Sequence, residues 1–243
     1  MNHNLSDQVF LKEMAAKKAV DVLVKDNMKL GLGSGTTAVL AVRYIGELFE
    51  QGLLQNIKIV STSFQTTIEC EKLGIPLYSL NSREINGALD LTIDGADEVD
   101  PENRCIKGGG GALLLEKITA YASDKYAIIV DESKIVQNLG LAFPLPVELI
   151  PEARLYVCKH LEKMGAEVRL REAVKKAGPV ITDHGNLLLD ILFKKAIDPV
   201  KLERDINCIP GVVENGFFTG PLDRQLRPIV FIARKNNKVE QRD

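Results

Sequence analysis

Residues 28–38 read Met-Lys-Leu-Gly-Leu-Gly-Ser-Gly-Thr-Thr-Ala, and this stretch indicates the fold class. Its apolar start predicts a strand over residues 28–32, and the spacing of apolar residues after it predicts a helix over residues 36–51. A glycine turn between a strand and a helix is typical of an open parallel sheet. Its N–H groups and the positive end of the helix dipole point at one spot, which suits an anion.

The alternation of strands and helices continues on both sides of this turn and predicts a parallel sheet of about five strands. The pattern gives a first helix over residues 9–24. The other expected strands are 57–61, 76–80, 88–93, 105–106 and 126–130, and the other expected helices are 64–73 and 112–123. The apolar strand expected over residues 229–233 should return to this sheet, whereas the polar residues 235–243 should fray.

After residues 143–146, Phe-Pro-Leu-Pro, the order of the expected strands and helices changes to βαββαβ, the order of a ferredoxin-like unit, with one extra strand as a hairpin arm. Its expected strands are 147–150, 167–171, 180–183, 187–193 and 209–213, and its expected helices are 152–164 and 199–206. The sequence therefore predicts an α/β protein with two domains. A Rossmann-like parallel-sheet domain should comprise residues 1–145 and 215–243, and a smaller ferredoxin-like α+β domain should comprise residues 146–214.

Composition narrows the possible partners. The 243 residues include 45% hydrophobic residues and carry a net charge of −2, so no overall positive field would attract a nucleic acid. No apolar run reaches the roughly 18 residues that a membrane helix needs. The four cysteines and three histidines are dispersed, which favours reduced thiols in the cytoplasm and gives no metal-ligand spacing. We expect no metal and no cofactor.

The glycine turn carries hydroxyl groups that could contact a phosphate. Ser34, Thr36 and Thr37 surround Gly35, although a plain helix cap would also use such residues. A dinucleotide site would need the spacing G-x-G-x-x-G and an acid at the end of the next strand, and neither is present. A nucleotide-binding P-loop would need Lys directly after the last glycine, where this chain has Thr36.

An acidic loop follows the strand that ends near residue 93. Asp94 and Asp97 lie just past its carboxyl end, the edge where open α/β sheets bind their ligands, so we expect both to face the crevice. Gly95 and Ala96 leave the space between the two carboxylates open. Three further acids are interpreted as turn-forming or solvated charges: Glu98, Asp100 and Glu102.

A second glycine run, Lys107 followed by glycines at 108–111, leads into the next predicted helix. Four consecutive glycines cost about 0.5 to 1 kcal/mol each relative to alanine, so a functional role is favoured over a flexible linker. The amides of this run should form a second cluster of donors, with the Lys107 cation at its edge.

Glu116 lies one turn into that helix, and its neighbours four residues away are Ala112 and Ala120. It has no local ion-pair partner, so it is either a general base or a glutamate that reaches solvent. Lys134 follows the strand over residues 126–130 and is either a second cation in the crevice or an exposed lysine in a capping turn.

Several ordered motifs together resemble type A ribose-5-phosphate isomerase, and the match spans nearly the whole chain. The motifs are residues 31–38, 94–98, 107–110 with Glu116 and Lys117, Ser133-Lys134, 143–151, 182–186 and 209–213. The resemblance implies interconversion of D-ribose 5-phosphate and D-ribulose 5-phosphate through an enediol, in the non-oxidative pentose phosphate pathway. It implies a cytoplasmic homodimer or homotetramer that needs no metal.

The resemblance also implies residue roles. Glu116 would move the proton between C2 and C1, and Asp94 would assist opening of the furanose ring. Asp97, Lys107 and the glycine amides would hold the sugar hydroxyls and the enediolate. Leu115 stands where some relatives have arginine, which could alter substrate affinity. The expected substrate-binding residues are Ser34, Gly35, Thr36, Thr37, Asp94, Gly95, Ala96, Asp97, Lys107, Gly108, Gly109, Gly110 and Lys134.

Two other functions share this fold by resemblance. In coenzyme A transferases a glutamate carries the acyl group, so the candidate glutamate would be trapped as a thioester. A sugar-phosphate sensor of a transcription regulator would normally carry a helix-turn-helix, and the single helix expected before Met28 leaves no room for one.

Overall fold

The computed structural model describes residues 2–221 and 226–243, and its internal contacts divide the chain into two units. Unit 1 contains the chain up to Ala96 with Leu115–Ile135 and Gly220–Asp243, and unit 2 contains Asp97–Leu114 and Val136–Thr219. This division gives residues 97–114, 136–145 and 215–219 to the smaller unit. The domain boundaries expected from the sequence stay a prediction, and Met1 and residues 222–225 of the expected large domain lie outside the described residues.

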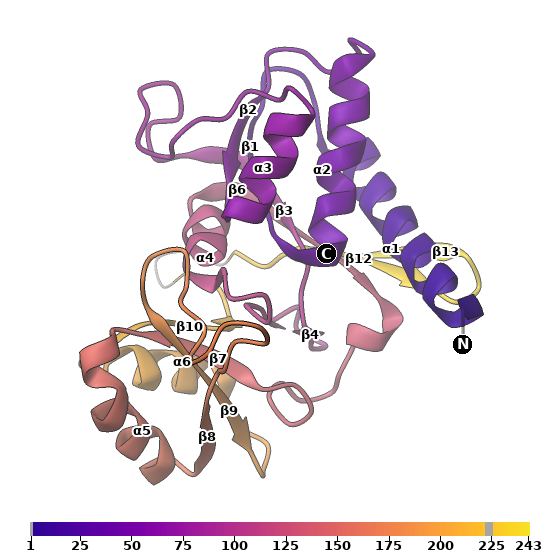
Figure 1. The fold of residues 1–243 in the computed structure, drawn as a ribbon. Coiled ribbons are helices and arrows are strands. Elements are labelled where there is room, and N and C mark those ends of the chain that lie inside the picture. Colours follow the sequence, from indigo (N-terminus) through magenta and orange to yellow (C-terminus); the bar gives the residue numbers. More distant parts are fainter. Residues whose placement is uncertain (1, 222–225) are drawn as a thin grey trace. The chain divides into compact units, whose positions relative to one another are not determined.

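Unit 1 is built on a six-stranded sheet with the order β13-β12-β6-β3-β1-β2 (Figure 1). Five of these strands are parallel and β13 is antiparallel to β12, so the expected parallel sheet is confirmed. The strands are β1 (Lys29–Leu32), β2 (Lys58–Ser61), β3 (Leu89–Asp94), β6 (Ser123–Asp131), β12 (Ile229–Arg234) and β13 (Lys238–Arg242).

Helices cover both faces of this sheet. Successive side chains of β3 point to opposite faces, and buried side chains lie on each. Leu91 and Ile93 belong to the same hydrophobic core as α1 (Asn2–Leu23) and α2 (Gly35–Glu50). Thr92 points to the other face, where its hydroxyl contacts the carbonyl of Thr119 on α4 (Leu113–Tyr121) at 3.2 Å. In addition, α3 (Phe64–Lys72) packs beside α2.

The strand expected over residues 76–80 is wrong. Only Leu77 forms a bridge, to Ile59, and the Tyr78 N–H donates to the Ile59 carbonyl at 2.8 Å. Pro76 has no N–H to add to a ladder, and the chain then turns back on itself through a bond from the Gly87 N–H to the Leu80 carbonyl. The fifth parallel strand is β12, whose return to this sheet was expected, whereas the strand expected at residues 105–106 pairs antiparallel in a separate small sheet.

The expectation that residues 235–243 fray is also wrong. They form β13, which pairs with β12 from Arg234↔Lys238 to Val230↔Arg242. Asn237 takes the left-handed conformation, with φ 59°, that a tight hairpin needs. An ion pair of 2.6 Å joins Arg234 and Glu240 across the hairpin. The polar composition therefore belongs to an edge strand.

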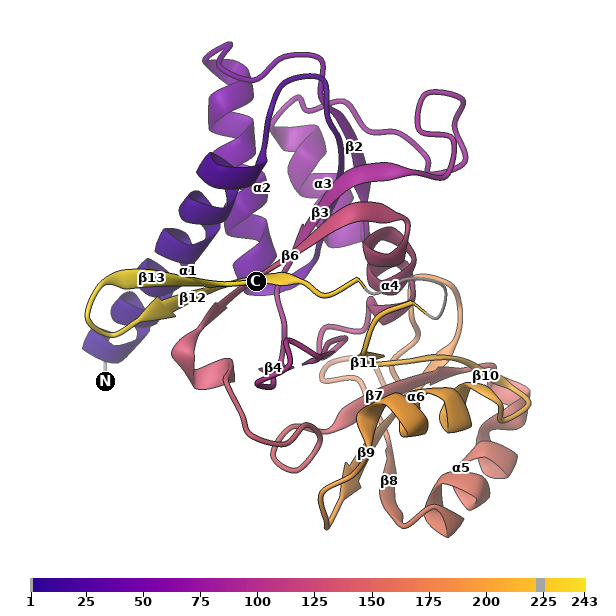
Figure 2. The same ribbon diagram turned by 180° about the vertical axis from the view of Figure 1, so that it is seen from behind.

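Unit 2 confirms the ferredoxin-like order (Figure 2). Its antiparallel sheet has the order β10-β7-β9-β8, and α5 and α6 join the strands in the βαββαβ sequence. The elements are β7 (Leu145–Leu149), a short 3-10 turn (Pro151–Ala153), α5 (Arg154–Lys163), β8 (Ala166–Leu170), β9 (Leu187–Phe193), α6 (Pro199–Asn207) and β10 (Val212–Asn215). Residues 180–183 were expected to be a strand, but only the single bridge Ile181↔Leu187 lies there.

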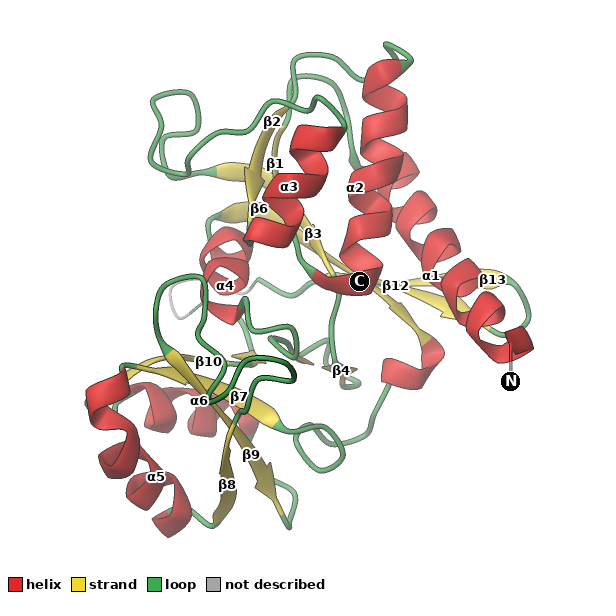
Figure 3. Ribbon diagram, viewed as in Figure 1, coloured by secondary structure: helices red, strands yellow, loops and turns green. Residues whose placement is uncertain are grey.

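A small three-stranded sheet completes unit 2. It consists of β11 (Phe217–Phe218), β5 (Cys105–Ile106) and β4 (Glu98–Val99), in that order. Figure 3 draws the loops on either side of β4 in green. Because β5 directly precedes Lys107, this sheet carries the second glycine run. Among the described residues, no helix has the length and apolar character to cross a bilayer.

Candidate active site

The carboxyl ends of the parallel strands gather candidate residues at one edge of unit 1. Ser34 follows β1, Asp94 ends β3 and Lys134 follows β6, and these strands are parallel neighbours in the sheet. Lys134 is half-buried at the end of a 3-10 turn (Glu132–Lys134) that the Asp131 carboxylate caps by accepting from the Ser133 N–H at 2.9 Å. Sequence reasoning expected this edge to collect the site.

Asp94 is buried, with 0% of its surface exposed, and joins two of the expected site segments. Its Oδ1 accepts from the Gly95 N–H at 2.7 Å and from the Ser34 N–H at 3.2 Å. A Cβ on Gly33 would lie 1.9 Å from the same oxygen, so only glycine permits this approach. The glycine at position 33 therefore makes room for a carboxylate of the protein itself.

The Ser34 hydroxyl contacts other hydroxyl groups. It lies 2.8 Å from Thr62 Oγ1, 2.5 Å from Ser63 Oγ and 3.3 Å from Thr66 Oγ1. Ser34 occupies the N-cap position of α2, yet its side chain caps no N–H group, so the plain cap interpretation is wrong for this hydroxyl. Instead, Oε1 of Gln65 accepts from the Gly35 N–H at 2.9 Å.

Sequence reasoning missed a lysine at this turn. The ammonium of Lys12, on α1, donates to Thr36 Oγ1 at 3.1 Å and so lies at the start of α2. A lysine on a helix surface looks like any solvated charge, and the sequence offered no signal that would distinguish it. Lys12 adds a cation to the hydroxyls and the helix terminus, which together favour an anion.

Glu116 lies in the first turn of α4 and is only 4% exposed, so the alternative of a surface glutamate is wrong. The helix around it is fixed by the Thr119 hydroxyl, which donates to the Leu115 carbonyl at 2.8 Å and to the Glu116 carbonyl at 3.1 Å. Burying a carboxylate is costly, and side chains that bear this cost are concentrated at functional sites.

Unit 2 holds Lys107 in a buried position, with 3% exposure. The Lys107 N–H donates to the Gly216 carbonyl at 2.9 Å, and its ammonium nitrogen lies 5.3 Å from the centre of the Phe218 ring. An aromatic face attracts a cation at this distance. Lys107 is therefore held by both its backbone and its side chain.

The second glycine run is an ordered turn, so the flexible-linker alternative is wrong. Gly108 and Gly111 have φ values of 92° and 86°, a region that favours glycine. The Gly111 N–H donates to the Gly108 carbonyl at 2.9 Å, and the Gly109 N–H donates to Asp97 Oδ2 at 2.8 Å. Asp97 thus holds this turn in unit 2, whereas Ser34, Gly35, Asp94 and Gly95 are brought together in unit 1.

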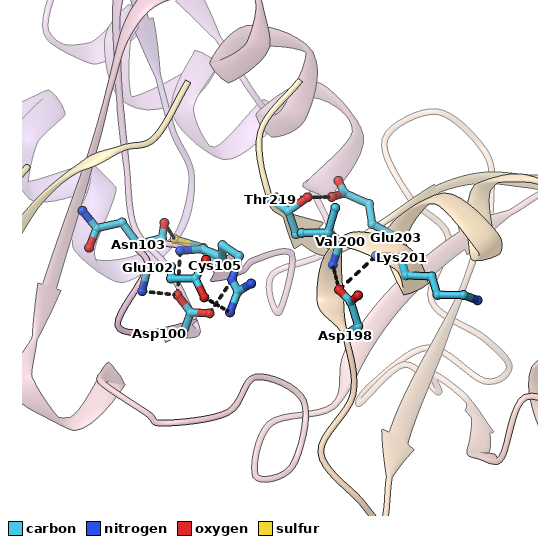
Figure 4. Close-up of polar contacts among 10 residues, drawn as sticks. Asp100, Glu102, Asn103, Cys105, Asp198, Val200, Lys201, Glu203 and Thr219 are labelled. Atoms are coloured by element: carbon cyan, nitrogen blue, oxygen red, sulfur yellow. Dashed lines mark hydrogen bonds and ion pairs between the residues drawn. The ribbon is translucent and has the colours of Figure 1, made fainter. Parts of the chain in front are cut away.

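The other acids of the loop have structural roles. Asp100 forms the turn between β4 and β5, because its carboxylate accepts from the N–H groups of Glu102 and Arg104 at 2.9 Å (Figure 4). The Arg104 side chain forms ion pairs with Asp100 and with Glu102. This confirms the turn-forming interpretation for Asp100. In the same unit, the Asp198 carboxylate caps α6.

Glu98 is not a solvated charge, and this interpretation is corrected. Its carboxylate is buried and accepts from the N–H groups of Gly140 at 2.7 Å and Phe143 at 2.9 Å. Burial raises the pKa of Glu98, and the backbone hydrogen bonds of Gly140, Phe143 and Ala142 oppose that rise. The partners lie more than 40 residues away, so the local sequence could not indicate them.

Comparison with known proteins identifies the family. The family model for ribose 5-phosphate isomerase A (phosphoriboisomerase A) matches residues 58–236. A relative from Treponema denticola named ribose-5-phosphate isomerase A is 53% identical, over 95% of this chain and 97% of its own length. The chain belongs to the ribose 5-phosphate isomerase A family. A relative from Treponema pallidum is 48% identical over 95% of this chain and 92% of its own.

Solved structures of the family match this fold. Ribose 5-phosphate isomerase A from Methanocaldococcus jannaschii has a TM-score of 0.88 and 40% identity, and the match covers 96% of this chain and 98% of the other. A D-ribose-5-phosphate isomerase in complex with phospho-erythronic acid has the same TM-score with 37% identity and the same coverage. The resemblance identified from the sequence is confirmed, and the chain is an enzyme of the isomerase class.

Proposed function

We propose that this chain interconverts D-ribose 5-phosphate and D-ribulose 5-phosphate through an enediolate, with Glu116 as the base. The observation that carries the proposal is the buried carboxylate of Glu116 in a member of the ribose 5-phosphate isomerase A family. In the open-chain aldose, Glu116 takes the proton from C2, and the electron pair forms the C1=C2 bond while charge moves to O1. Return of the proton to C1, with transfer of the O2 proton to O1, gives the ketose.

The first glycine turn is proposed to bind the phosphate. Thr36 and Thr37 supply hydroxyls at the N-terminus of α2, and Lys12 lies against Thr36. A phosphate that binds there would meet donors, a cation and the helix dipole together. Gly35 and Lys134 are included among the proposed substrate-binding residues, as are Gly95 and Ala96.

The second glycine turn is proposed to stabilise the enediolate. Lys107 and the N–H groups of Gly108 and Gly110 are the proposed donors, with Gly109 as part of the turn, and donors held in place are worth most where charge develops. Asp97 contributes by holding the turn through the Gly109 N–H. The role of Asp94 in opening the furanose ring rests on the family resemblance.

The relative in complex with phospho-erythronic acid suggests a ligand for this chain. This compound carries a phosphate at one end and a carboxylate at the other, and the carboxylate has the charge and paired oxygens of an enediolate. We propose that it binds this chain more tightly than a neutral polyol phosphate of similar length.

The proposal is tested by incubating the purified chain with ribose 5-phosphate in a chelator and measuring formation of the ketose. Conversion should proceed, and unphosphorylated ribose should be a poor substrate because it lacks the phosphate. Loss of activity that only a divalent ion restores would contradict the metal-free route. In a separate incubation with acyl-coenzyme A, a thioester on Glu116 would favour a transferase.

Assembly and location are further parts of the proposal. Family resemblance predicts a homodimer or homotetramer, which light scattering after size-exclusion chromatography would measure as two or four times 26.8 kDa. The reaction is assigned to the cytoplasm, where its sugar phosphates would be found, and fractionation of cells would check this.

A further inference from the structure

An arginine of the unit 2 sheet holds the second glycine turn. Arg171 directly follows β8, and its side chain is 16% exposed. Its Nη1 donates to the carbonyl oxygens of Gly109 at 3.0 Å and Gly108 at 3.4 Å. Its Nε donates to Asp190 Oδ2 at 2.9 Å, and Nη2 donates to Oδ1 of the same carboxylate. One guanidinium thus joins a carboxylate of β9 to two consecutive peptides of the turn.

These contacts fix the direction of two peptide groups. A trans peptide is planar, and its C=O and N–H point to opposite sides. Because the carbonyls of Gly108 and Gly109 point to Arg171, the N–H groups of Gly109 and Gly110 point away from it. The Gly109 N–H reaches Asp97, and the exposed Gly110 N–H has no hydrogen-bond partner in the described part of the chain.

The turn needs such an anchor because glycine has the largest backbone freedom of all residues. A hydrogen bond from a charged donor is about twice as strong as a neutral one, and hydrogen bonds in a chain polarise one another. The guanidinium therefore both orders these peptides and makes their N–H groups better donors. Asp190 fixes the guanidinium in turn through two parallel bonds, the geometry in which arginine is most specific.

We propose that Arg171, anchored by Asp190, is a positioning residue that aims the Gly110 N–H at the negative charge that develops on the substrate. Arg171 does not touch the substrate in this arrangement and acts through the Gly108 and Gly109 carbonyls. The inference rests on the proposed function and adds to it a residue 61 positions away from Gly110 in the sequence.

The main test compares Arg171→Met with Arg169→Met. Arg169 lies on the same part of the chain and also pairs with an acid, Glu167, but it is exposed and contacts no glycine carbonyl. Arg171→Met should lower kcat by about 10- to 100-fold, since removing an oxyanion donor outright costs about 10²- to 10³-fold. The KM for ribose 5-phosphate should change less than about threefold, because the donor acts on developing charge. Arg169→Met should resemble the wild type.

A binding measurement separates positioning from general damage. Affinity for phospho-erythronic acid, which carries the charged carboxylate, should fall by roughly the same factor as kcat/KM in Arg171→Met. Affinity for ribitol 5-phosphate, a neutral polyol with the same phosphate, should stay within about threefold. Equal losses for both ligands would mean that the arginine only supports the fold, and the inference would be overturned.

A second variant covers the case in which Arg171→Met does not fold. Arg171→Lys keeps the charge but cannot fork between a carboxylate and two carbonyls, so its kcat should lie between wild type and the methionine variant. A kcat of Arg171→Lys equal to wild type, with wild-type affinity for phospho-erythronic acid, would contradict the inference. An inactive wild type would instead refute the proposed function, so the two failures are distinguishable.

Discussion

The two glycine turns of this chain differ in which backbone groups the protein itself occupies. In the first turn, side chains take the N–H groups: Asp94 accepts from Ser34, and Gln65 accepts from Gly35. In the second turn, Arg171 donates to the carbonyls of Gly108 and Gly109 and Asp97 accepts from the Gly109 N–H, but the Gly110 N–H has no partner among the described residues. Side chains contact N–H and carbonyl groups in both turns, since Thr66 donates to the Gly33 carbonyl in the first, and the turns differ in the N–H that the second leaves open at Gly110.

This difference indicates two kinds of ligand contact. In the first turn, side chains take the N–H groups of Ser34 and Gly35, and the side-chain groups at the turn include the Thr36 hydroxyl and the Lys12 ammonium beside it. The second turn presents a backbone N–H at Gly110. Flexible side chains suit a phosphate that stays the same during reaction, whereas a fixed peptide suits charge that appears only in the transition state.

The largest effect should come from the residue that belongs to neither turn. Glu116→Gln keeps the size of the side chain but cannot accept a proton, so turnover should fall by about 10² to 10⁴ while phospho-erythronic acid still binds. In deuterated water, the wild type should place deuterium at C1 of the product. As a control, Glu102→Gln should keep full activity, because Glu102 is exposed.

Retention of near-full turnover by Glu116→Gln would remove it as the base and turn attention to Asp94 and Asp97. Transfer of hydrogen without any deuterium wash-in over many turnovers would also contradict a carboxylate shuttle, since a hydride shift carries the original hydrogen across.

Lys107→Met tests whether the second turn acts on the developing charge and not on the phosphate. The substitution removes a donor for developing charge but keeps an apolar chain over Phe218, so kcat should fall by about 10² with a small change in KM. Steady-state kinetics with ribose 5-phosphate measure both constants. A rise in KM with unchanged kcat would place Lys107 at the phosphate and would break the division of roles between the turns.

The first turn should give the opposite pattern. Replacing Thr36 and Thr37 together by valine should raise KM by about tenfold and leave kcat within about threefold, because phosphate contacts act alike on ground and transition states. The affinity for inorganic phosphate as an inhibitor should fall in parallel. A pure loss of turnover would argue that this turn also acts on the reacting carbons.

The smallest effect concerns stability. Ser34→Ala removes a hydroxyl that contacts Thr62, Ser63 and Thr66, and each net hydrogen bond of this kind is worth about 1 kcal/mol. The free energy of unfolding in urea should fall by about 1 to 2 kcal/mol, with little change in kcat. A large loss of activity at full stability would mean that the Ser34 hydroxyl contacts the substrate directly.

The periodicity of apolar residues correctly predicted the elements whose positions in the sheet follow from the fold class. The β1 strand, the glycine turn and α2 were all expected, since strand and helix periods are written in the sequence itself. Residues 76–80 and 238–242 were misjudged because pairing with a neighbouring strand, and not hydrophobicity, decides whether an edge segment becomes a strand.

The candidate site followed the same rule. Asp94 and Ser34 were expected at one edge because the ends of parallel strands meet there. Lys12, Glu98 and Arg171 were missed or misjudged because their partners lie 19 to 63 residues away, and nothing in their neighbourhoods marks a long-range contact.

The charged hairpin strand β13 also bears on whether molecules of this chain associate through the edge of the sheet in concentrated solution. It covers one side of β12, whose residues Val230 to Ala233 are buried, and it presents Lys238 and Glu240 outward at the edge of the sheet. Charged side chains on an edge strand discourage a second molecule from adding its own strand there. A chain that ended at Arg234 would expose the apolar β12 as an open template, and we expect it to aggregate at concentrations at which the intact protein stays dispersed.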